Sequence, residues 1–527
     1  MWLHADIKLL PDIVRHRARV TPDKTALIEG KRRLSFRELD ATTNRIAHAI
    51  ARDCARDGAR PDSVVAFVGK NSIPFFEIMF GSGKAGCTVL PLNWRLAAAE
   101  LVAIVDDGAP ALVFVDKEFL PLMDKVLEGA ARPFKVVAFD SAAEGDSGLA
   151  VWCAGVPGSD PDLATDPRAI ALLMYTSGTT GRAKGVEMSH QGLDRMRLCE
   201  SLEPEFQWRA DDVLLMVMPN FHLLGASLPI QSLYNGSTVS ILPVLDPGRL
   251  LGLIQTDRPT ILVLAPIVIQ MILDHPAAKD TDFSSVRLTM YAGSPINAEL
   301  LKRAMREMKC EFMQFYGATE SLGAITILRP AQHDLQHESK LKACGTPLPL
   351  IEIKVTDDQG EELPDGEIGE FRMRSPATFS GYRNQPEATA AVLQRGWYRT
   401  GDAGFRDKDG LLYIVDRVKD MIVSGGENIY SSEVEQALQK HPAVAVSAVV
   451  GAPDPRWGEK VVAIVVLKKD QSVTAEELNQ HCRTLIGGFK VPKEITFAES
   501  LPISPTGKIL KRVLRDALWQ GHERAIG

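Results

Sequence analysis

The sequence predicts an α/β protein with a large N-terminal domain and a smaller C-terminal domain. Short apolar runs alternate with amphipathic patterns over about the first four hundred residues, which is typical of sheets covered by helices. The chain has 527 residues, more than one hydrophobic core can organise. After Asp416 a new series of strand and helix patterns begins. We therefore expect one domain over residues 1–416 and another over residues 417–527.

The elements follow from the spacing of apolar residues. Largely apolar runs predict buried strands at residues 63–69, 111–116, 134–139, 170–175, 260–265 and 287–293. Apolar residues three and four apart predict helices at 34–51 and 296–308. The turn sequences DDQG and PDGE, between Ile351 and Ser375, predict antiparallel hairpins. In the C-terminal part, residues 442–451 and 460–469 predict strands, and 474–486 predict a helix that Thr474 caps together with Glu477.

Composition and charge exclude several classes of protein. The net charge is −7 and the basic residues are scattered, which argues against a nucleic-acid partner. The seven cysteines show no CxxC spacing, which argues against a disulfide framework or a zinc site and for a reducing compartment. The longest apolar run, TILVLAPIVIQMIL, is too short for a transmembrane segment. Neither end carries a targeting signal, so a cytoplasmic protein is expected.

The stretch YTSGTTGRAKGVEMSH, from Tyr175 to His190, has the composition of a phosphate-binding loop. We expect a strand, a glycine loop and then a helix. Glycines let backbone N–H groups turn towards an anion, hydroxyls add donors, and Lys184 adds a positive charge. The spacing differs from GxxxxGK[ST], which argues against a P-loop NTPase. Taken alone, the stretch leaves a solvated turn without a ligand as the alternative.

Further motifs follow in a recognisable order: MPNFHLLG, YAGSPI, QFYGATES, GWYRTGD, DRVKDMIVSGGENIYSSEVE and SPTGKILKRVLR. Together with TSGTTGRAKGVEMSH they resemble the adenylate-forming superfamily of acyl-CoA synthetases, luciferases and peptide-synthetase adenylation domains. The resemblance spans nearly the whole chain. It implies that a carboxylic acid attacks ATP, with Mg²⁺, to give an acyl-adenylate and pyrophosphate, and that a thiol then displaces AMP. It also implies a large domain of two helix-covered sheets plus a β-barrel-like part, and a small mobile α+β domain.

The resemblance assigns roles to residues of the nucleotide site. Glu320 and Thr319 would bind the metal, Tyr316 would stack on adenine, and Asp402 and Arg417 would hold the ribose or phosphate. Acceptor-only carboxylates suit the two ribose hydroxyls. The remaining nucleotide-binding residues are expected in the phosphate loop (Thr176, Ser177, Gly178, Thr179, Thr180, Gly181 and Lys184), on the wall opposite adenine (Gly293, Ser294 and Pro295), and beside Tyr316 (Phe315, Gly317 and Ala318).

Residues near the C-terminus would serve the two half-reactions. By resemblance, Lys508 would contact the carboxylate and the ribose–phosphate bridge during adenylation, and Lys419 would be the hinge. Many relatives carry Asp at the hinge, and we interpret the lysine as a branch marker. A pantetheine arm would pass Gly425 and Gly426, and Glu427 would pair with His222 during thioester formation. The nucleotide end of coenzyme A would lie between Trp457 and Phe489, although aromatic residues are more often part of a core.

The same resemblance outlines the acyl pocket. Its expected residues are His222, Leu223, Leu224, Gly225, Ala292, Phe315, Gly317, Leu322 and Gly323. The set is apolar and small, which suits a fatty, aryl-propenoic or polycyclic acid. No Asp follows Phe221, where amino-acid-activating relatives carry one, so a free amino acid is not expected.

The predicted function is an ATP-dependent acid–CoA ligase, and three alternatives remain. The compact stretch between GWYRTGD and DRVKD favours coenzyme A over the fatty-acyl-AMP ligase branch. A ligase that loads a carrier-protein phosphopantetheine would use the same chemistry. The motifs also leave luciferase chemistry open. A non-catalytic nucleotide- or acyl-binding protein is disfavoured because Lys184, Glu320, Asp402 and Lys508 are all present. A homodimer is common among relatives, and the sequence does not decide the oligomeric state.

Overall fold

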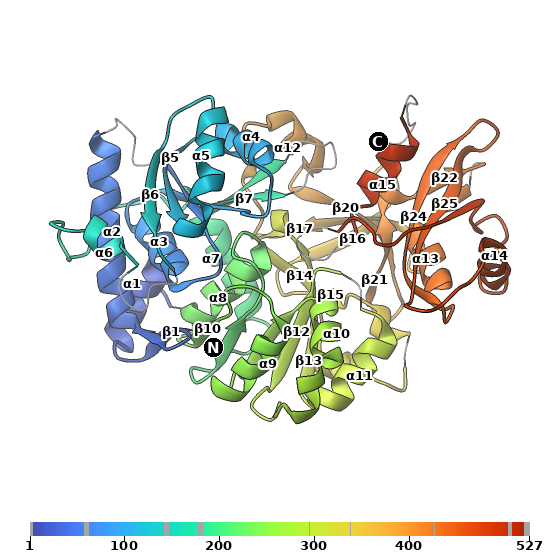
Figure 1. The fold of residues 1–527 in the computed structure, drawn as a ribbon, viewed down its shortest axis with the longest axis horizontal. Coiled ribbons are helices and arrows are strands. Elements are labelled where there is room, and N and C mark those ends of the chain that lie inside the picture. Colours follow the sequence, from blue (N-terminus) through green and yellow to red (C-terminus); the bar gives the residue numbers. More distant parts are fainter. Residues whose placement is uncertain are drawn as a thin grey trace. The chain divides into compact units, whose positions relative to one another are not determined.

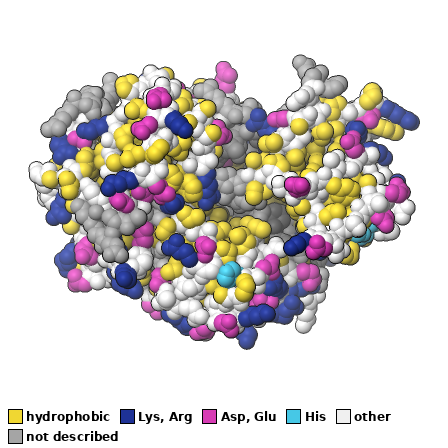
Figure 2. All heavy atoms as spheres, in the orientation of Figure 1, with side chains coloured by type: hydrophobic (Ala, Val, Ile, Leu, Met, Phe, Trp, Pro, Cys, Tyr) yellow, Lys and Arg dark blue, Asp and Glu magenta, His cyan; other side chains and the backbone are white. Residues whose placement is uncertain are grey.

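The computed structural model describes residues 4–56, 63–141, 147–176, 183–294, 296–337, 339–425, 427–503 and 509–520. Contacts between residues divide the chain into two compact units, which are described separately. The first unit contains Met1–Glu352 and Arg374–Tyr398, and the second contains Ile353–Met373 and Arg399–Gly527. The expected domain boundary between residues 416 and 417 stays a prediction. On the face shown in Figure 2, basic and acidic side chains are interspersed over the surface.

A seven-stranded sheet forms one layer of the first unit (Figure 1). Its order is β18 (Gly381–Tyr382), β8 (Lys184–Ser189), β7 (Ile170–Thr176), β4 (Thr88–Leu92), β3 (Val64–Val68), β5 (Pro110–Asp116) and β6 (Lys135–Phe139). The strands from β7 to β6 are parallel, whereas β8 is antiparallel to both β7 and β18. Helices α4 (Ala98–Gly108) and α5 (Leu120–Gly129) pack on β3, β4 and β5 and form an apolar core there.

A nine-stranded sheet forms the other large layer of the first unit. Its order is β15 (Thr346–Pro347), β14 (Gly323–Leu328), β13 (Glu311–Ala318), β12 (Leu288–Ala292), β11 (Ile261–Leu264), β9 (Val213–Met216), β10 (Thr238–Ile241), β1 (Thr25–Glu29) and β2 (Arg32–Ser35). The strands from β13 to β1 are parallel, and the edges are antiparallel.

The other helices of the first unit flank and connect these sheets. They are α1 (Asp12–Val20), α2 (Phe36–Arg56), α3 (Ile73–Lys84), α6 (Leu149–Trp152), α7 (His190–Ser201), α8 (Leu223–Tyr234), α9 (Pro247–Thr256), α10 (Pro266–Asp274), α11 (Ala298–Met308) and α12 (Pro386–Val392). Among the described helices, none is both long enough and apolar enough to cross a membrane.

Five of the six predicted buried strands are confirmed, because they lie inside the two sheets. The sixth, residues 134–139, is wrong as a buried strand: it forms β6 at the edge of its sheet, where Lys135 and Ala138 are exposed. All five residues of β3 are buried, as are all five of β12, and strands covered on both faces carry such continuous apolar runs. The expectation of a helix directly after the phosphate loop is wrong. The chain returns as strand β8, and α7 begins only at His190, where Ser189 Oγ accepts from Gly192 N at 3.1 Å. Strand β8 forms because it pairs with β7 on one side and β18 on the other.

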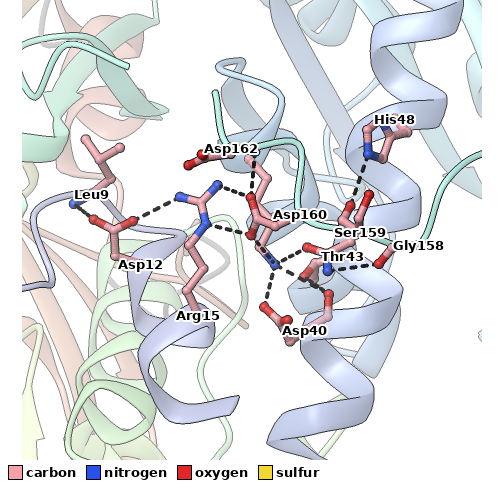
Figure 3. A network of polar contacts seen from close by, with 12 residues as sticks. Leu9, Asp12, Arg15, Asp40, Thr43, His48, Gly158, Ser159, Asp160 and Asp162 are labelled. Atoms are coloured by element: carbon pink, nitrogen blue, oxygen red, sulfur yellow. Dashed lines mark hydrogen bonds and ion pairs between the residues drawn. The ribbon is translucent and has the colours of Figure 1, made fainter. Parts of the chain in front are cut away.

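Buried charges join three helices of the first unit to the segment before β7 (Figure 3). Lys84, at the end of α3, has a fully buried side chain. Its Nζ lies 2.6 Å from Asp40 Oδ1 and 2.6 Å from Asn44 Oδ1, both on α2. Arg15 of α1 donates to both carboxylate oxygens of Asp160, at 2.8 and 2.9 Å. A buried cation needs such partners, and this network fixes the residue 158–162 segment against α1 and α2.

A smaller antiparallel sheet contains β16 (Glu352–Thr356), β17 (Gly369–Arg374), β20 (Trp397–Arg406) and β21 (Leu412–Arg417), with β19 (Leu393–Gln394) at its end. The last sheet belongs to the second unit and has the order β23 (Glu427–Ile429), β22 (Ile422–Ser424), β25 (Gly458–Leu467) and β24 (Val444–Asp454), with β26 (Glu494–Phe497) beside β25. Helices α13 (Ser431–Gln439), α14 (Ala475–Arg483) and α15 (Lys511–Leu518) complete this unit. The predicted cap of α14 is confirmed: Glu477 N donates to Thr474 Oγ1, and Thr474 N donates to Glu477 Oε2.

Candidate active site

A tight turn between β13 and β14 presents two of the predicted metal-site residues. Ser321 closes the turn, because its Oγ accepts from Ala318 N at 2.9 Å and lies 2.7 Å from Gly323 O. A Cβ on Gly317 would come within 2.1 Å of Gly323 O, so only glycine fits there. The turn leaves Thr319 and Glu320 half-buried.

The segment Phe379–Tyr382 holds Glu320 from two sides. Tyr382 Oη donates to Glu320 Oε1 at 2.8 Å, and Phe379 N donates to the Glu320 carbonyl at 3.0 Å. Among the described residues, none donates a hydrogen bond to Oε2. A half-exposed carboxylate with a fixed orientation and an oxygen left over suits Mg²⁺, which prefers oxygen ligands and keeps several waters. The residues present therefore fit the predicted metal.

Lys184 lies at the mouth of the β7–β8 hairpin, where it pairs with Thr176 across the two strands. Its Nζ lies 4.8 Å from the centre of the Tyr382 ring, within the range of a cation–π contact. Lys184 and Glu320, far apart in the sequence, thus both contact Tyr382. The loop residues Ser177, Gly178, Thr179, Thr180 and Gly181 lie outside the described residues.

The predicted adenine wall lies at the ends of two adjacent parallel strands. Ala292 of β12 pairs with Phe315 of β13, and both side chains are buried. Phe315 packs edge-on against Phe206, with ring centres 5.1 Å apart. Gly293 follows Ala292 with φ +93°, a conformation that favours glycine, and Ser294 comes next.

Three further predicted residues belong to this nucleotide wall. Tyr316 and Ala318 are half-buried on β13, and Gly317 between them is exposed. Pro295 lies outside the described residues. The structure therefore brings the described part of the predicted adenine wall to the carboxyl ends of β12 and β13 in the nine-stranded sheet.

The predicted acyl-pocket residues divide into two groups. His222 is the N-cap residue of α8, and Leu223 and Leu224 in its first turn are half-buried. A Cβ on Gly225 would come within 2.0 Å of Pro219 O, so glycine lets α8 approach the preceding turn. Leu224 and Gly225 lie against the apolar side chains of Leu214, Met216 and Val263, between α8 and strand β9.

The other group packs towards α7. Leu322 is fully buried, and its Cδ2 would be 2.7 Å from a Cβ on Gly192. A Cβ on Gly323 would lie 2.9 Å from Met196 Cγ, so Met196 fills the space beside that glycine.

In the second unit, the two predicted ribose residues form an ion pair. Asp402 of β20 and Arg417 of β21 are register partners, and their side chains approach to 2.7 Å. The Asp402 side chain is buried, whereas that of Arg417 is about half exposed. Lys419 lies two residues further on; burial and the nearby Arg417 and Arg515 guanidinium groups lower its pKa. The fold therefore places the ribose pair directly before the predicted hinge.

A surface tryptophan covers one of the predicted thiol-channel glycines. Gly425, with φ +62°, donates from its N to Trp457 O at 2.8 Å, and a Cβ there would lie 2.7 Å from Trp457 Cε3. Trp457 is 43% exposed, and the Arg456 guanidinium lies 4.6 Å from its ring centre. The structure thus brings Gly425 and Trp457 together.

The other predicted thiol-site residues have these positions. Glu427 is exposed on β23, and Phe489 is exposed beside Lys490, whose Nζ lies 5.5 Å from its ring centre. Gly426 and Lys508 lie outside the described residues.

Sequence reasoning missed Tyr382, which contacts both a predicted phosphate-binding residue and a predicted metal ligand. Its motif, GYRN, contains no residue type that would single it out for metal or phosphate chemistry. One sequence signal could have indicated Tyr382. It directly follows the run FRMRSPATFS, whose strand pattern predicts that the next residues lie near the edge of a sheet.

The fold and these side chains define a class of protein: an enzyme that binds a nucleotide and activates a carboxylic acid as an adenylate. The AMP-binding enzyme family model matches residues 14–383, and the AMP-binding enzyme C-terminal domain model matches residues 433–508. The chain belongs to the AMP-binding enzyme family.

Several relatives share nearly the full length of the chain. A fatty acid–[acyl-carrier-protein] ligase, ScoC of Streptomyces coeruleorubidus, is 37% identical and is matched over 99% of each chain. A feruloyl-CoA synthase from an Amycolatopsis species is 35% identical, over 95% of this chain and 97% of that one. ATP-bound MatB from Rhodopseudomonas palustris has a similar structure, with a TM-score of 0.87 and 28% identity over 97% of this chain and 98% of that one.

These similarities confirm the predicted class. The chain is an AMP-forming acid–thiol ligase of the acyl-CoA ligase branch, a class that uses ATP, Mg²⁺ and coenzyme A. The fold class is confirmed as well, with helix-covered sheets in a large N-terminal part and antiparallel strands in the C-terminal one.

Proposed function

We propose that this enzyme joins a hydrophobic monocarboxylic acid to coenzyme A, with cleavage of ATP to AMP and pyrophosphate. The observation that carries the proposal is the convergence of Lys184 and the Glu320 carboxylate on one side chain, beside the adenine wall at the ends of β12 and β13. A cation for phosphate oxygens and an anion for a metal are the two charges that adenylation needs.

Each residue of the site has a distinct task in the proposed reaction. Lys184 and the loop after Thr176 hold the β- and γ-phosphates, which orients the α-phosphate for attack by the carboxylate. Thr319 and Glu320 would hold Mg²⁺, which would supply charge neutralisation at the phosphates. Phe315, Tyr316 and Gly293 form the walls around adenine, and Asp402 accepts from the ribose hydroxyls. Lys508 stabilises the charge on the forming adenylate.

We further propose that the chain alternates between two arrangements. Lys419 is the hinge in this proposal, with domains at residues 1–416 and 417–527. In the first arrangement Lys508 serves adenylation. In the second, the thiol of coenzyme A passes Gly425 and Gly426, and Glu427 pairs with His222.

Arg456 and Trp457 support coenzyme A as the acceptor. The exposed indole can stack on an adenine, and the guanidinium above it can bind a phosphate. A carrier-protein phosphopantetheine lacks the adenine nucleotide, so an Arg–Trp pair of this kind would have no use there. The second candidate, a carrier-protein ligase, is favoured by the 37% identity to ScoC.

The apolar surroundings of α8 support a hydrophobic acid. Leu224 and Gly225, two of the predicted pocket residues, lie among side chains that are all apolar. Two of the relatives act on feruloyl and fatty acyl groups by name. We therefore propose an aryl-propenoic or fatty acid, with a polycyclic acid as the other candidate.

Pyrophosphate release with ATP, Mg²⁺ and a panel of such acids tests the proposal. Coenzyme A, holo-acyl carrier protein or neither is added, and products are followed by mass. Release by one class of acid, with a thioester only when coenzyme A is present, supports the proposal. A thioester only on the carrier protein would establish the second candidate, and no release with any acid of the panel would contradict the proposed substrate class.

A further inference from the structure

Tyr382 lies between the two opposite charges of the proposed adenylation site. Its hydroxyl donates to Glu320 Oε1 at 2.8 Å, and its ring faces Lys184 Nζ at 4.8 Å. The hydroxyl of a phenol donates hydrogen bonds, and the face of its ring attracts a cation through a cation–π interaction. One rigid side chain therefore contacts the cation and the anion at the same time.

The surrounding structure fixes Tyr382 in this position. Its backbone pairs with Val186 across β18 and β8, and its N donates to Thr389 Oγ1 at 2.9 Å. Phe379 packs against its ring, with centres 5.0 Å apart. The side chain is 7% exposed. A buried ring with a bonded backbone and a packed neighbour has little freedom to follow Glu320 or Lys184 if they move.

We propose that Tyr382 is a positioning residue for adenylation: its hydroxyl orients the Glu320 carboxylate for Mg²⁺, and its ring keeps Lys184 available for phosphate. The inference deepens the proposed function and rests on it. Without the ring between them, the Lys184 ammonium and the Glu320 carboxylate could approach and form an ion pair. Such an ion pair would compete with both the metal and the phosphates, so Tyr382 separates two charges that must act on the same nucleotide.

Two substitutions separate the two contacts. Tyr382→Phe keeps the ring face and removes only the hydroxyl. Tyr382→Leu removes both. Tyr413→Phe is the matched control, because Tyr413 Oη also donates to a carboxylate, Asp407 Oδ2, at 3.1 Å, but in the second unit and outside the site. Thermal unfolding of each variant shows that it is folded.

The main measurement is calorimetric binding of ATP without acid, once with Mg²⁺ and once with EDTA, so that no turnover is involved. For Tyr382→Phe, the gain in ATP affinity from Mg²⁺ should fall about 10-fold, as expected for a lost hydrogen bond to a charged group, while binding in EDTA stays as in the wild type. For Tyr382→Leu, binding in EDTA should also weaken, about 3-fold. Tyr413→Phe should match the wild type in both conditions.

A double-mutant cycle tests whether Tyr382 acts through the carboxylate. On a Glu320→Gln background, Tyr382→Phe should have little further effect on the Mg²⁺ gain, because the group that it orients has lost its charge. Equal effects on both backgrounds would overturn the inference.

The proposed function and this inference fail in different ways. If the wild type binds no ATP, the proposed function falls, and the inference falls with it. If the wild type binds ATP and gains affinity from Mg²⁺, and Tyr382→Phe does the same to the same extent, only the role of Tyr382 is overturned.

Discussion

Replacing Gly317 with alanine tests whether the turn that presents Thr319 and Glu320 is as tight as the structure shows. A Cβ at this position would lie 2.1 Å from Gly323 O, 3.0 Å from Gly323 C and 3.1 Å from Ala324 Cα. All three atoms belong to the backbone of the antiparallel partner strand β14, so no side chain can rotate away. Strands β13 and β14 must therefore separate by roughly 1 Å at the turn.

The size of the effect follows from that displacement. Overpacking of this kind costs about 1–3 kcal/mol in the free energy of unfolding. A misplacement of roughly 1 Å in a catalytic group lowers the rate about 100-fold. We therefore expect Gly317→Ala to lose about 1–3 kcal/mol of stability and to lower kcat/KM for pyrophosphate release about 100-fold.

The matched control is Gly252→Ala on helix α9, where a Cβ would meet nothing within 4 Å. Alanine is the better helix former, so this variant should gain about 1 kcal/mol and keep its activity. Urea unfolding and a coupled pyrophosphate assay measure both quantities. A Gly317→Ala enzyme with wild-type stability and kcat/KM would refute the geometry of the turn.

Three further outcomes are expected. Asp402→Asn should weaken ATP binding about 10-fold in calorimetry, because a carboxylate paired with Arg417 is replaced by a neutral amide; unchanged binding would remove Asp402 from the ribose site. Arg456→Ala should raise KM for coenzyme A about 5-fold and leave acid-dependent pyrophosphate release without coenzyme A unchanged, whereas equal losses in both would point to a structural role. Burial lowers the pKa of His190 from 6.5 to about 4, so the unfolded chain binds a proton that the native chain does not between these values, and stability falls as the pH drops from 6.5 to 4. Over that pH interval the free energy of unfolding falls by about 3 kcal/mol. His190→Gln should flatten the pH dependence of stability in urea unfolding, and an unchanged slope of stability against pH would contradict this prediction.

The fold could be predicted where burial alone decides it. Strands β3, β5 and β12 are confirmed because both faces of a central parallel strand need apolar side chains, and a continuous apolar run satisfies this in any surroundings. Strand β8 could not be predicted in this way. Its six residues, KGVEMS, carry no periodicity long enough to separate a strand from the start of a helix. Its two neighbours decide its structure, and one of them, β18, lies almost two hundred residues further along the chain.

The candidate site also divides into residues that the sequence could indicate and residues that only the fold brings together. Glu320 and Lys184 could be named as candidates from sequence because each lies in a motif rich in chemistry-bearing residues. Tyr382 could not, because it lies 62 residues after Glu320 and only the fold brings the two together. The role of the polar groups in the loop after Thr176 stays a prediction, since Ser177 to Gly181 lie outside the described residues.

Strand β18 has only two residues, yet it connects the two parts of the proposed site. Gly381 and Tyr382 pair with Glu187 and Val186 of the phosphate hairpin, and the Tyr382 side chain reaches the metal-site turn. A movement of the hairpin would therefore pull on Glu320, whereas the packed ring of Tyr382 resists a movement of Glu320 alone. Because the hairpin and the turn come from different sheets, no local sequence feature could hold them in register. A third segment that bonds to both is the simplest way to keep phosphate and metal ligands at a fixed separation, and the Phe379–Tyr382 segment is placed to do this.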